Sequence, residues 1–195
     1  MSTKPGRKLH EEGVALFRKE QPEAALAKFQ EALSHATNDP HHTAEIYNDL
    51  GATYKELKQY EAAYEALDES SKLFIELDDK KGQAQALGNL ASVLEAEGLL
   101  EEAVDAYKQS ATMLEDMGQG ELAMYVWQAV SRLRMKQKQY IAAIGAYEEG
   151  VENMPEGSIK KKILGRLLRM PGSFMGGLGG AAQDEEDEDD PDSDE

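Results

Sequence analysis

A unit of about 40 residues recurs four times in this chain, and this repetition constrains the fold more than any other feature of the sequence. Similar residues recur at intervals of 38, 40 and 40 in several independent columns. The columns are Ala25, Ala63, Ala103 and Ala143; Phe29, Leu67, Tyr107 and Tyr147; Gly13, Gly51, Ala91 and Ser131; and Ala32, Ser70, Ser110 and Gly150. Because the columns stay in step, the units are predicted to be copies of one motif that stack side by side.

Each unit contains two helical patterns. In the second unit, one helix face is formed by Ile46, Leu50, Tyr54 and Leu57. The segment 60–77 has the same period, and no stretch alternates in the two-residue period of a strand. Proline and glycine punctuation then sets the expected helix ends. The expected helices are 6–19, 22–37, 41–58, 60–78, 80–97, 99–117, 119–138, 140–154 and 158–170.

Small residues indicate how the two helices of a unit approach each other. Each pair is twelve residues apart: Gly51 with Ala63, Ala91 with Ala103, and Ser131 with Ala143. One hairpin cannot bury both of its faces, so neighbouring hairpins must stack. The predicted fold is therefore all-α: a right-handed α-α superhelix of four helical hairpins, closed by a C-terminal amphipathic capping helix.

The residue pattern of the second unit resembles that of a known repeat family. The order Tyr47, Leu50, Gly51, Tyr54, Ala63 and Leu67 is similar to the signature of the tetratricopeptide repeat (TPR), and the fourth unit repeats it with Trp127, Val130, Ser131, Ala143, Tyr147 and Pro155. The resemblance covers residues 6–155, divided at about 6–40, 41–79, 80–118 and 119–155. Repeats of 38 to 40 residues are about one helical turn longer per pair than the usual 34. In this respect Gly82 to Gly98 is similar to the longer repeats of kinesin light chains and spindle-orientation adaptors.

The resemblance implies a TPR solenoid that binds protein, and it implies where the ligand lies. In this family the first helix of each pair lines a concave groove. The same offsets here point to Asn48, Gln85, Asn89, Tyr125, Gln128 and Arg132, with the smaller Ala52 and Ser92 between them. Amide side chains offer paired donors and acceptors to an extended peptide, although the alternative that they are simply solvated stays open. The clamp by which related co-chaperones hold a chaperone tail has no counterpart, since only Asn89 fits it.

Residues 156–170 form a different segment, whose helix is basic and amphipathic. Its apolar stripe is Ile159, Ile163, Leu164, Leu167 and Leu168, and its cations are Lys160, Lys161, Lys162, Arg166 and Arg169. Three interpretations compete: a cap on the fourth unit, an interfacial membrane anchor, and a docking helix for an acidic partner. The cap is favoured because the open end of a solenoid has to be covered, and we do not expect membrane contact.

The C-terminal end combines a glycine-rich tether, 171–183, with a tail, 184–195, that holds ten acids and is expected to be disordered. The tail accounts for much of the net charge of −17, so residues 1–183 carry 28 acids against 21 Lys and Arg, or −7. Nucleic acid is not an expected partner, because phosphate contacts need a basic surface. We hypothesise that the tail screens the basic helix; the alternatives are that it binds basic proteins or only confers solubility.

Other classes of function lack support in the sequence. The absence of cysteine excludes disulfides, thiolate metal sites and thiol catalysis. Met1 to Leu9 has no apolar signal core and no stretch is long enough to span a membrane, so a cytoplasmic protein is expected. The four histidines have no zinc-protease spacing, His41 and His42 are expected at the surface, and no phosphate-binding loop or catalytic triad is present. We therefore expect no enzyme activity, no cofactor and no metal.

These observations favour an adaptor or scaffold that binds a protein or peptide ligand in its concave groove. Two alternatives remain. The first is an acidic-tailed chaperone or assembly factor for basic proteins, in which the tail is the binding element. The second is a structural TPR protein that stacks head to tail into homo-oligomers. Trp127 and the tyrosines at helical spacing are expected to belong to the core.

Overall fold

The computed structural model describes residues 5–36 and 38–168, and within them the chain forms nine α-helices and no strand. The helices are α1 (Pro5–Phe17), α2 (Pro22–Ser34), α3 (Pro40–Glu56), α4 (Tyr60–Glu76), α5 (Lys80–Glu97), α6 (Leu100–Asp116), α7 (Gly120–Lys136), α8 (Tyr140–Glu152) and α9 (Ile159–Leu168). The predicted all-α class is confirmed. The tether 171–183, the tail 184–195 and Arg169 lie outside the described residues.

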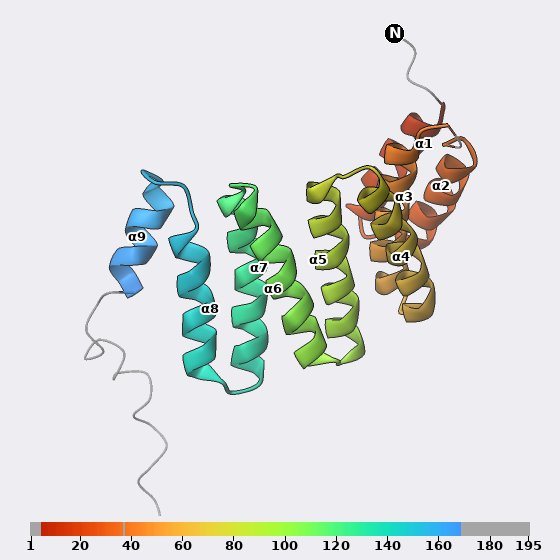
Figure 1. Cartoon of the computed structure of the whole chain (residues 1–195). Helices are drawn as coiled ribbons and strands as arrows, with labels where there is room; N and C mark the ends of the chain where they lie inside the picture. The colour runs from red at the N-terminus through yellow and green to blue at the C-terminus, as the bar shows by residue number, and fades with distance from the viewer. Residues whose placement is uncertain (1–4, 37, 169–195) are drawn as a thin grey trace, which may run out of the picture.

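Consecutive helices pair into hairpins, and the hairpins stack in chain order. The pairs α1 with α2, α3 with α4, α5 with α6 and α7 with α8 make the most extensive contacts, and each hairpin then contacts the next through its second helix. Figure 1 shows the result as an open array, with α1 to α4 turned relative to the row formed by α5 to α9. Each unit therefore touches only its neighbours, as a solenoid requires.

In the first three units, the first helices lie on the side where neighbouring units approach each other most closely. Helix α1 contacts α3 and α3 contacts α5 directly, whereas no comparably close pair joins the second helices in the described part of the chain. A stack whose units approach more closely on one face curves toward that face. We call the face that carries α1, α3, α5 and α7 the inner face.

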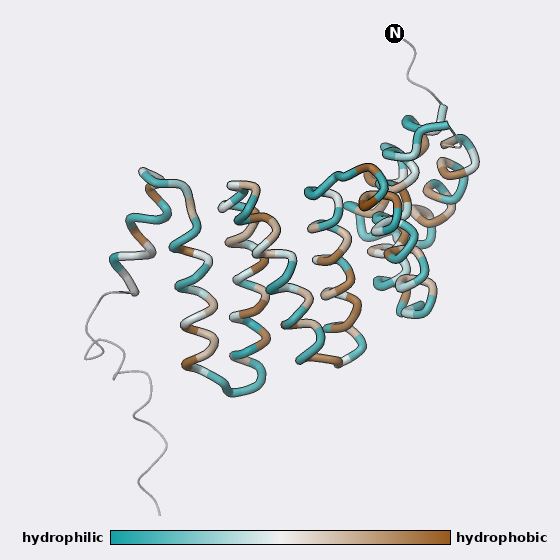
Figure 2. Tube along the Cα trace, viewed as in Figure 1, coloured by the Kyte–Doolittle hydropathy of each residue, from teal (hydrophilic) through white to brown (hydrophobic). Residues whose placement is uncertain are grey.

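The repeat columns form the core. Ala25, Ala63, Ala103 and Ala143 are at most 1% exposed, and the aromatic Phe29 is 1% exposed. Trp127 is 9% exposed within the cluster that joins α5 to α8, so its predicted place in the core is confirmed. The same prediction is wrong for Tyr125 and Tyr140, which are 61% and 56% exposed. In Figure 2 hydrophobic and hydrophilic segments alternate along the individual helices, as expected when each one buries a single side.

Close helix contacts use the small residues in two ways. In the fourth unit the Ser131 hydroxyl donates to the Ala143 carbonyl at 2.7 Å, which joins the pair that the sequence placed in contact. In the second unit a Cβ atom on Gly51 would lie 2.5 Å from Leu67 Cγ, sixteen residues later instead of twelve. The glycine therefore accommodates the bulky residue of the next column, because Leu67 lies one turn after Ala63 on the same face of α4.

The turn inside each hairpin has one backbone conformation. Glu20, Lys58, Gly98 and Lys138 all have positive φ, between 57° and 93°, and stand 38, 40 and 40 residues apart. The next residue donates its amide to the carbonyl five positions earlier, as in Gln59 to Tyr54 at 2.9 Å and Leu99 to Leu94 at 2.9 Å. This pattern is the Schellman ending of a helix, which favours glycine at the left-handed position.

Helix α9 follows the fourth unit and contacts α8. Lys161 anchors it, because its ammonium donates to the Glu152 carbonyl at 2.8 Å and pairs with Glu156 at 2.6 Å. Ile159 and Ile163 of the predicted covering stripe are 75% and 61% exposed, so these two side chains do not cover the fourth unit. Capping by α9 stays a prediction. Among the described helices, none has the length and apolar character needed to cross a bilayer.

Candidate functional site

Polar side chains connect the first helices along the inner face, from one unit to the next. Asn89 on α5 donates its amide to the Asn48 side-chain oxygen on α3 at 2.9 Å. Ser92, one turn further along α5, accepts a hydrogen bond from the Lys55 ammonium on α3 at 2.9 Å. Asn48 and Asn89, both predicted groove residues, are therefore brought together and bind each other, and both are half-buried. A ligand that uses these two amides must compete with their mutual hydrogen bond.

Glu95 on α5 connects α5 to α7 through ion pairs with two cations of α7. Both its oxygens accept from Arg132, at 2.6 and 2.8 Å, and Lys136 adds a contact of 3.0 Å. Partial burial opposes ionisation of Glu95, but the two cations outweigh it and hold the pKa of the carboxyl below its ordinary value. The predicted groove residue Arg132 is thus half of an ion pair, and its charge is largely compensated at this surface.

The remaining predicted groove residues are open to solvent. Gln85 on α5 and Gln128 on α7 are exposed, and Tyr125 on α7 is 61% exposed. Tyr125 is an aromatic side chain with a polar end, of the kind enriched in protein interfaces. It stands 40 residues after Gln85, so both occupy the same column of adjacent units.

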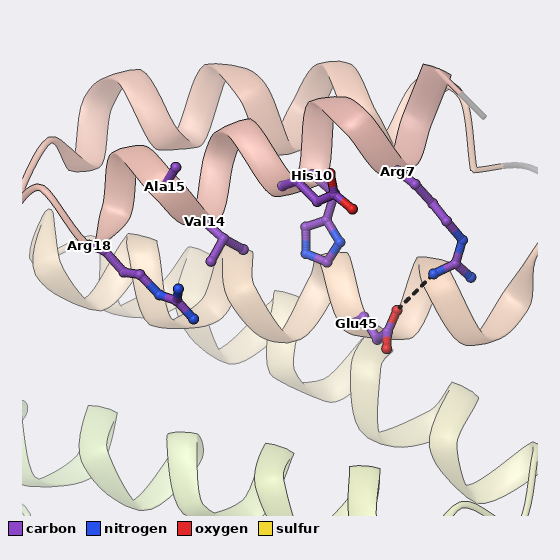
Figure 3. A pocket seen from close by; sticks show the side chains of 7 residues that line it. Arg7, His10, Val14, Ala15, Arg18 and Glu45 are labelled. Atoms are coloured by element: carbon purple, nitrogen blue, oxygen red, sulfur yellow. Dashed lines mark ion pairs between the residues drawn. The ribbon is translucent and has the colours of Figure 1, made fainter. Parts of the chain in front are cut away.

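A pocket of about 430 Å³ lies at the N-terminal end of the inner face (Figure 3). It is lined by Arg7, His10, Glu11, Val14, Ala15 and Arg18 from α1 and by Glu45 from α3. Arg7 precedes Glu45 by 38 residues and Gln85 by a further 40, so it belongs to the column of Gln85 and Tyr125. The pocket therefore continues the predicted groove into the first unit, where no groove residue is predicted from the sequence.

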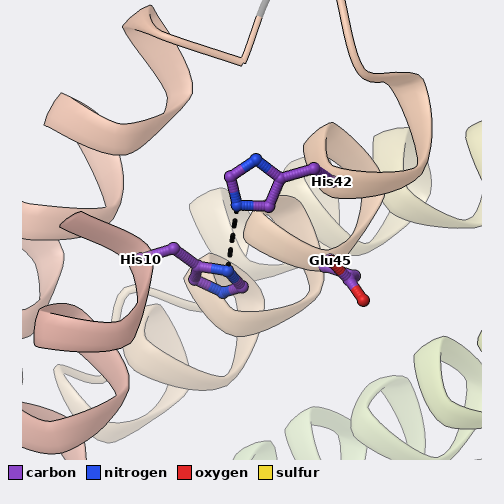
Figure 4. Close-up of side chains that lie close together, drawn as sticks. All are labelled: His10, His42 and Glu45. Carbon is purple, nitrogen blue, oxygen red and sulfur yellow. Dashed lines mark hydrogen bonds between the residues drawn. The ribbon is translucent and has the colours of Figure 1, made fainter. Parts of the chain in front are cut away.

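Two histidines meet beside this pocket (Figure 4). His10 Nδ1 lies 3.2 Å from His42 Nε2, and the other ring nitrogen of His10 lies 2.8 Å from Asp49 Oδ2. An ionised carboxylate only accepts, so His10 Nε2 donates to Asp49, its Nδ1 accepts, and His42 Nε2 donates. Burial lowers the pKa of His42, and the neighbouring His10 and Arg7 act in the same direction.

The expectation that His42 lies at the surface is wrong, because its side chain is 2% exposed. Asp39 caps α3 by accepting from the His42 amide at 3.2 Å, and this places residue 42 in the first turn, facing α1. His41, the next residue, is exposed as expected. His10 and His42 are 32 residues apart, so no local motif signals their contact; only the pairing of α1 with α3 produces it.

The cations of the basic helix α9 differ in how exposed they are. Lys160, Lys162 and Arg166 are exposed, whereas Lys161 is bound by Glu156 and the end of α8. The surface of α9 therefore presents at least three cations with no acid inside the helix itself.

A model of the family described as soluble NSF attachment protein, SNAP, matches residues 9–166, from the first turns of α1 into α9. The match thus includes all four units and the helix that follows them. Among curated proteins, none matches the chain.

Several solved structures are similar to the chain in fold. A kinesin light chain from Podospora anserina with nearly identical TPR-like repeats is 17% identical, with a TM-score of 0.62 over 78% of this chain and 76% of that chain. BtubC (BKLC) from P. vanneervenii is 16% identical, with a TM-score of 0.59 over 97% and 96%. Aspartyl phosphate phosphatase F from Bacillus subtilis is 11% identical, with a TM-score of 0.73 over 92% and 49%. These likenesses concern the fold alone, and they confirm the predicted TPR-like superhelix.

Proposed function

Because the chain belongs to the soluble NSF attachment protein family, we propose that it is an adaptor without enzymatic activity, which binds a segment of another protein along its inner face. The family description names the attachment of another protein, and this supports a protein as the ligand class. A repeat solenoid supplies a long continuous surface for such a ligand.

The observation that carries the proposal is the exposure of Gln85, Tyr125 and Gln128 on first helices of adjacent units. These side chains make no hydrogen bond to another described residue that would occupy their polar groups. An extended segment that crosses α5 and α7 can reach all three. Glu95 lies beside them and compensates one of the two cations Arg132 and Lys136. The polar groups of the three exposed side chains are uncharged, which favours a ligand recognised by its main chain.

The test replaces exposed inner-face residues while leaving the fold intact. Tyr125→Ala combined with Gln128→Arg should abolish co-purification of specific partner proteins, quantified by mass spectrometry against the unchanged full chain. Gln109→Arg on α6 is a matched control, because Gln109 is also an exposed helical glutamine but lies on a second helix. If the inner-face variant retains every partner that the control retains, the binding surface lies elsewhere and the proposal fails.

Self-assembly is a second candidate, and one observation favours it. Ile144 on α8 occupies the column of Val104, yet it is 40% exposed whereas Val104 is fully buried. The reason is that α7 covers the third unit, whereas within residues 5–36 and 38–168 no fifth unit covers the fourth. Tyr140 and Ile141 nearby are 56% and 89% exposed. A hairpin from a second copy would fit this repeat edge. Light scattering should then show a mass that rises with concentration and falls to the monomer value in Ile141→Lys; a constant monomer mass in the unchanged chain excludes it.

A further inference from the structure

We propose that His10, His42 and Glu45 form a binding site for a divalent transition-metal ion of the zinc type, which joins α1 to α3. The three residues can each offer one ligand atom, and these atoms lie within 4.8 Å of one another. Two imidazoles and a carboxylate are ligands that zinc accepts readily, whereas magnesium and calcium prefer oxygen alone. The proposal does not depend on the adaptor function, because it rests on a different set of side chains.

The two histidine nitrogens already have the separation that a shared ion requires. Ligand nitrogens at 2.0–2.1 Å from a tetrahedral ion lie about 3.3 Å apart, and His10 Nδ1 and His42 Nε2 are 3.2 Å apart. Without an ion, His42 Nε2 donates a hydrogen bond to His10 Nδ1. Moving that proton to the other nitrogen of the same neutral ring frees the His42 Nε2 lone pair, so no net charge has to be lost when the ion enters.

Asp49 holds His10 in the tautomer that binding requires. Its carboxylate accepts from His10 Nε2 at 2.8 Å, so Nδ1 carries the free lone pair. A carboxylate on the far nitrogen of a ligand histidine is the usual support in metal sites, where it fixes the ring and raises its basicity. Asp49 is therefore a positioning residue, since it acts on the ion only through His10.

Glu45 supplies the third ligand from the solvent side. Its carboxylate is about one-third exposed and lines the pocket, so an ion can enter there and the side chain can adjust. The surrounding groups are mixed in charge: Arg7 lies 3.9 Å from Glu45 but is held more closely, at 2.9 Å, by Asp39, and the exposed His41 lies 3.5 Å from Glu45. The open positions of the ion would face the pocket, and water or a side chain of a partner can occupy them.

Titration of the full chain with zinc chloride at neutral pH tests the proposal. Calorimetry should show one tight equivalent, and long-range proton–nitrogen spectra should show His10 Nδ1 and His42 Nε2 shifting as ligands. The spectra identify the site directly, whereas uptake by carboxylates elsewhere in the chain leaves the ring nitrogens unchanged. If zinc does not bind, or if it binds without moving these two resonances, the proposal is wrong.

Variants separate the ligands from the support. Glu45→Gln should weaken zinc binding, and Asp49→Ala should weaken it about tenfold or more, with partial recovery in Asp49→Asn, which still accepts from His10. His35→Gln is the matched control, because His35 is an exposed histidine that does not belong to the cluster of ligand atoms. His42→Gln removes a buried ligand, so its circular dichroism is compared first. Equal zinc affinity in Glu45→Gln, Asp49→Ala and the control overturns the proposal, whatever His42→Gln does.

Discussion

Helical glycines have opposite expected effects on stability, depending on what surrounds them. A Cβ atom on Gly51 would lie 2.5 and 2.7 Å from the Leu67 side chain, whereas one on Gly145 would meet nothing within 4 Å. Gly51→Ala should therefore lower the free energy of unfolding by about 1–3 kcal/mol, because it overpacks the core. Gly145→Ala should raise it by about 0.5–1 kcal/mol through helix propensity.

Urea unfolding of the two single variants measures both changes in the free energy of unfolding, the decrease in Gly51→Ala and the increase in Gly145→Ala. Leu67→Ala makes room for the new methyl group, so adding Gly51→Ala to Leu67→Ala should cost less than adding it to the unchanged chain. Equal costs in the two backgrounds would mean that Leu67 is not the residue that Gly51 accommodates.

The ion pair between Glu95 and Arg132 predicts a contribution to stability that depends on pH. The folded pKa of Glu95 is held below its ordinary value of 4.5, so the unfolded chain binds the proton more readily. The contribution is therefore present above about pH 4.5, where both states are ionised, and it is lost as the pH falls through the lower folded pKa.

Glu95→Gln should remove this contribution, about 1 kcal/mol for a partly exposed pair, at neutral pH. The difference between the two proteins should shrink as the pH falls below 4.5, and thermal unfolding across that range measures it. Glu102→Gln is a control, because Glu102 is exposed and has no ion pair among the described residues. A difference that stays constant with pH would contradict the assignment.

At the scale of elements, the turns within the hairpins carry unequal strain. Lys58 and Lys138 adopt φ of 57° and 60°, where Gly98 stands in the equivalent turn of the third unit. A residue with Cβ costs about 1–2 kcal/mol in this conformation. Lys58→Gly should therefore raise the free energy of unfolding by about 1 kcal/mol, and Gly98→Ala should lower it by a similar amount.

Lys58→Ala is the control for the lysine charge, because alanine removes the charge and keeps the strain. It should leave the urea midpoint nearly unchanged. If Lys58→Ala and Lys58→Gly shift the midpoint equally, the effect comes from the charge and the turn is not strained.

The elements themselves were largely predictable from the sequence, and the site only in part. Column spacing set the hairpins, because one motif is copied four times and each copy must fold alike. The helix ends differ from the predicted ones by up to three residues. At α1, α3, α4 and α7 the helix ends two residues early, because a left-handed residue follows shortly after its last turn. The exposure of Gln85 and Gln128 follows from their positions in the repeat. The Asn48–Asn89 hydrogen bond and the pairing of His10 with His42 could not be predicted, because each joins helices of different units and no local sequence pattern encodes how those helices are rotated.

At the scale of the whole molecule, the core is divided along the chain. One buried cluster joins α1 to α4 and another joins α5 to α8, and a smaller group that includes Ala63, Leu67 and Val93 lies at the joint between them. In a solenoid, stability is approximately a sum over units and the interfaces between neighbours. The position of a mutation along the stack should therefore decide which helices open.

Leu67→Ala at the joint and Leu133→Ala in α7 form a matched pair, because the two leucines are 2% and 0% exposed. Each should cost about 2–5 kcal/mol. Hydrogen exchange should then differ in pattern: Leu133→Ala speeds exchange in α7 and α8 and leaves α1 to α4 protected, whereas Leu67→Ala speeds exchange on both sides of the joint. The first pattern follows because a terminal unit can open at the cost of one interface, and the second because a central unit opens two. Uniform acceleration over every helix in both variants would show that the stack unfolds as one cooperative unit.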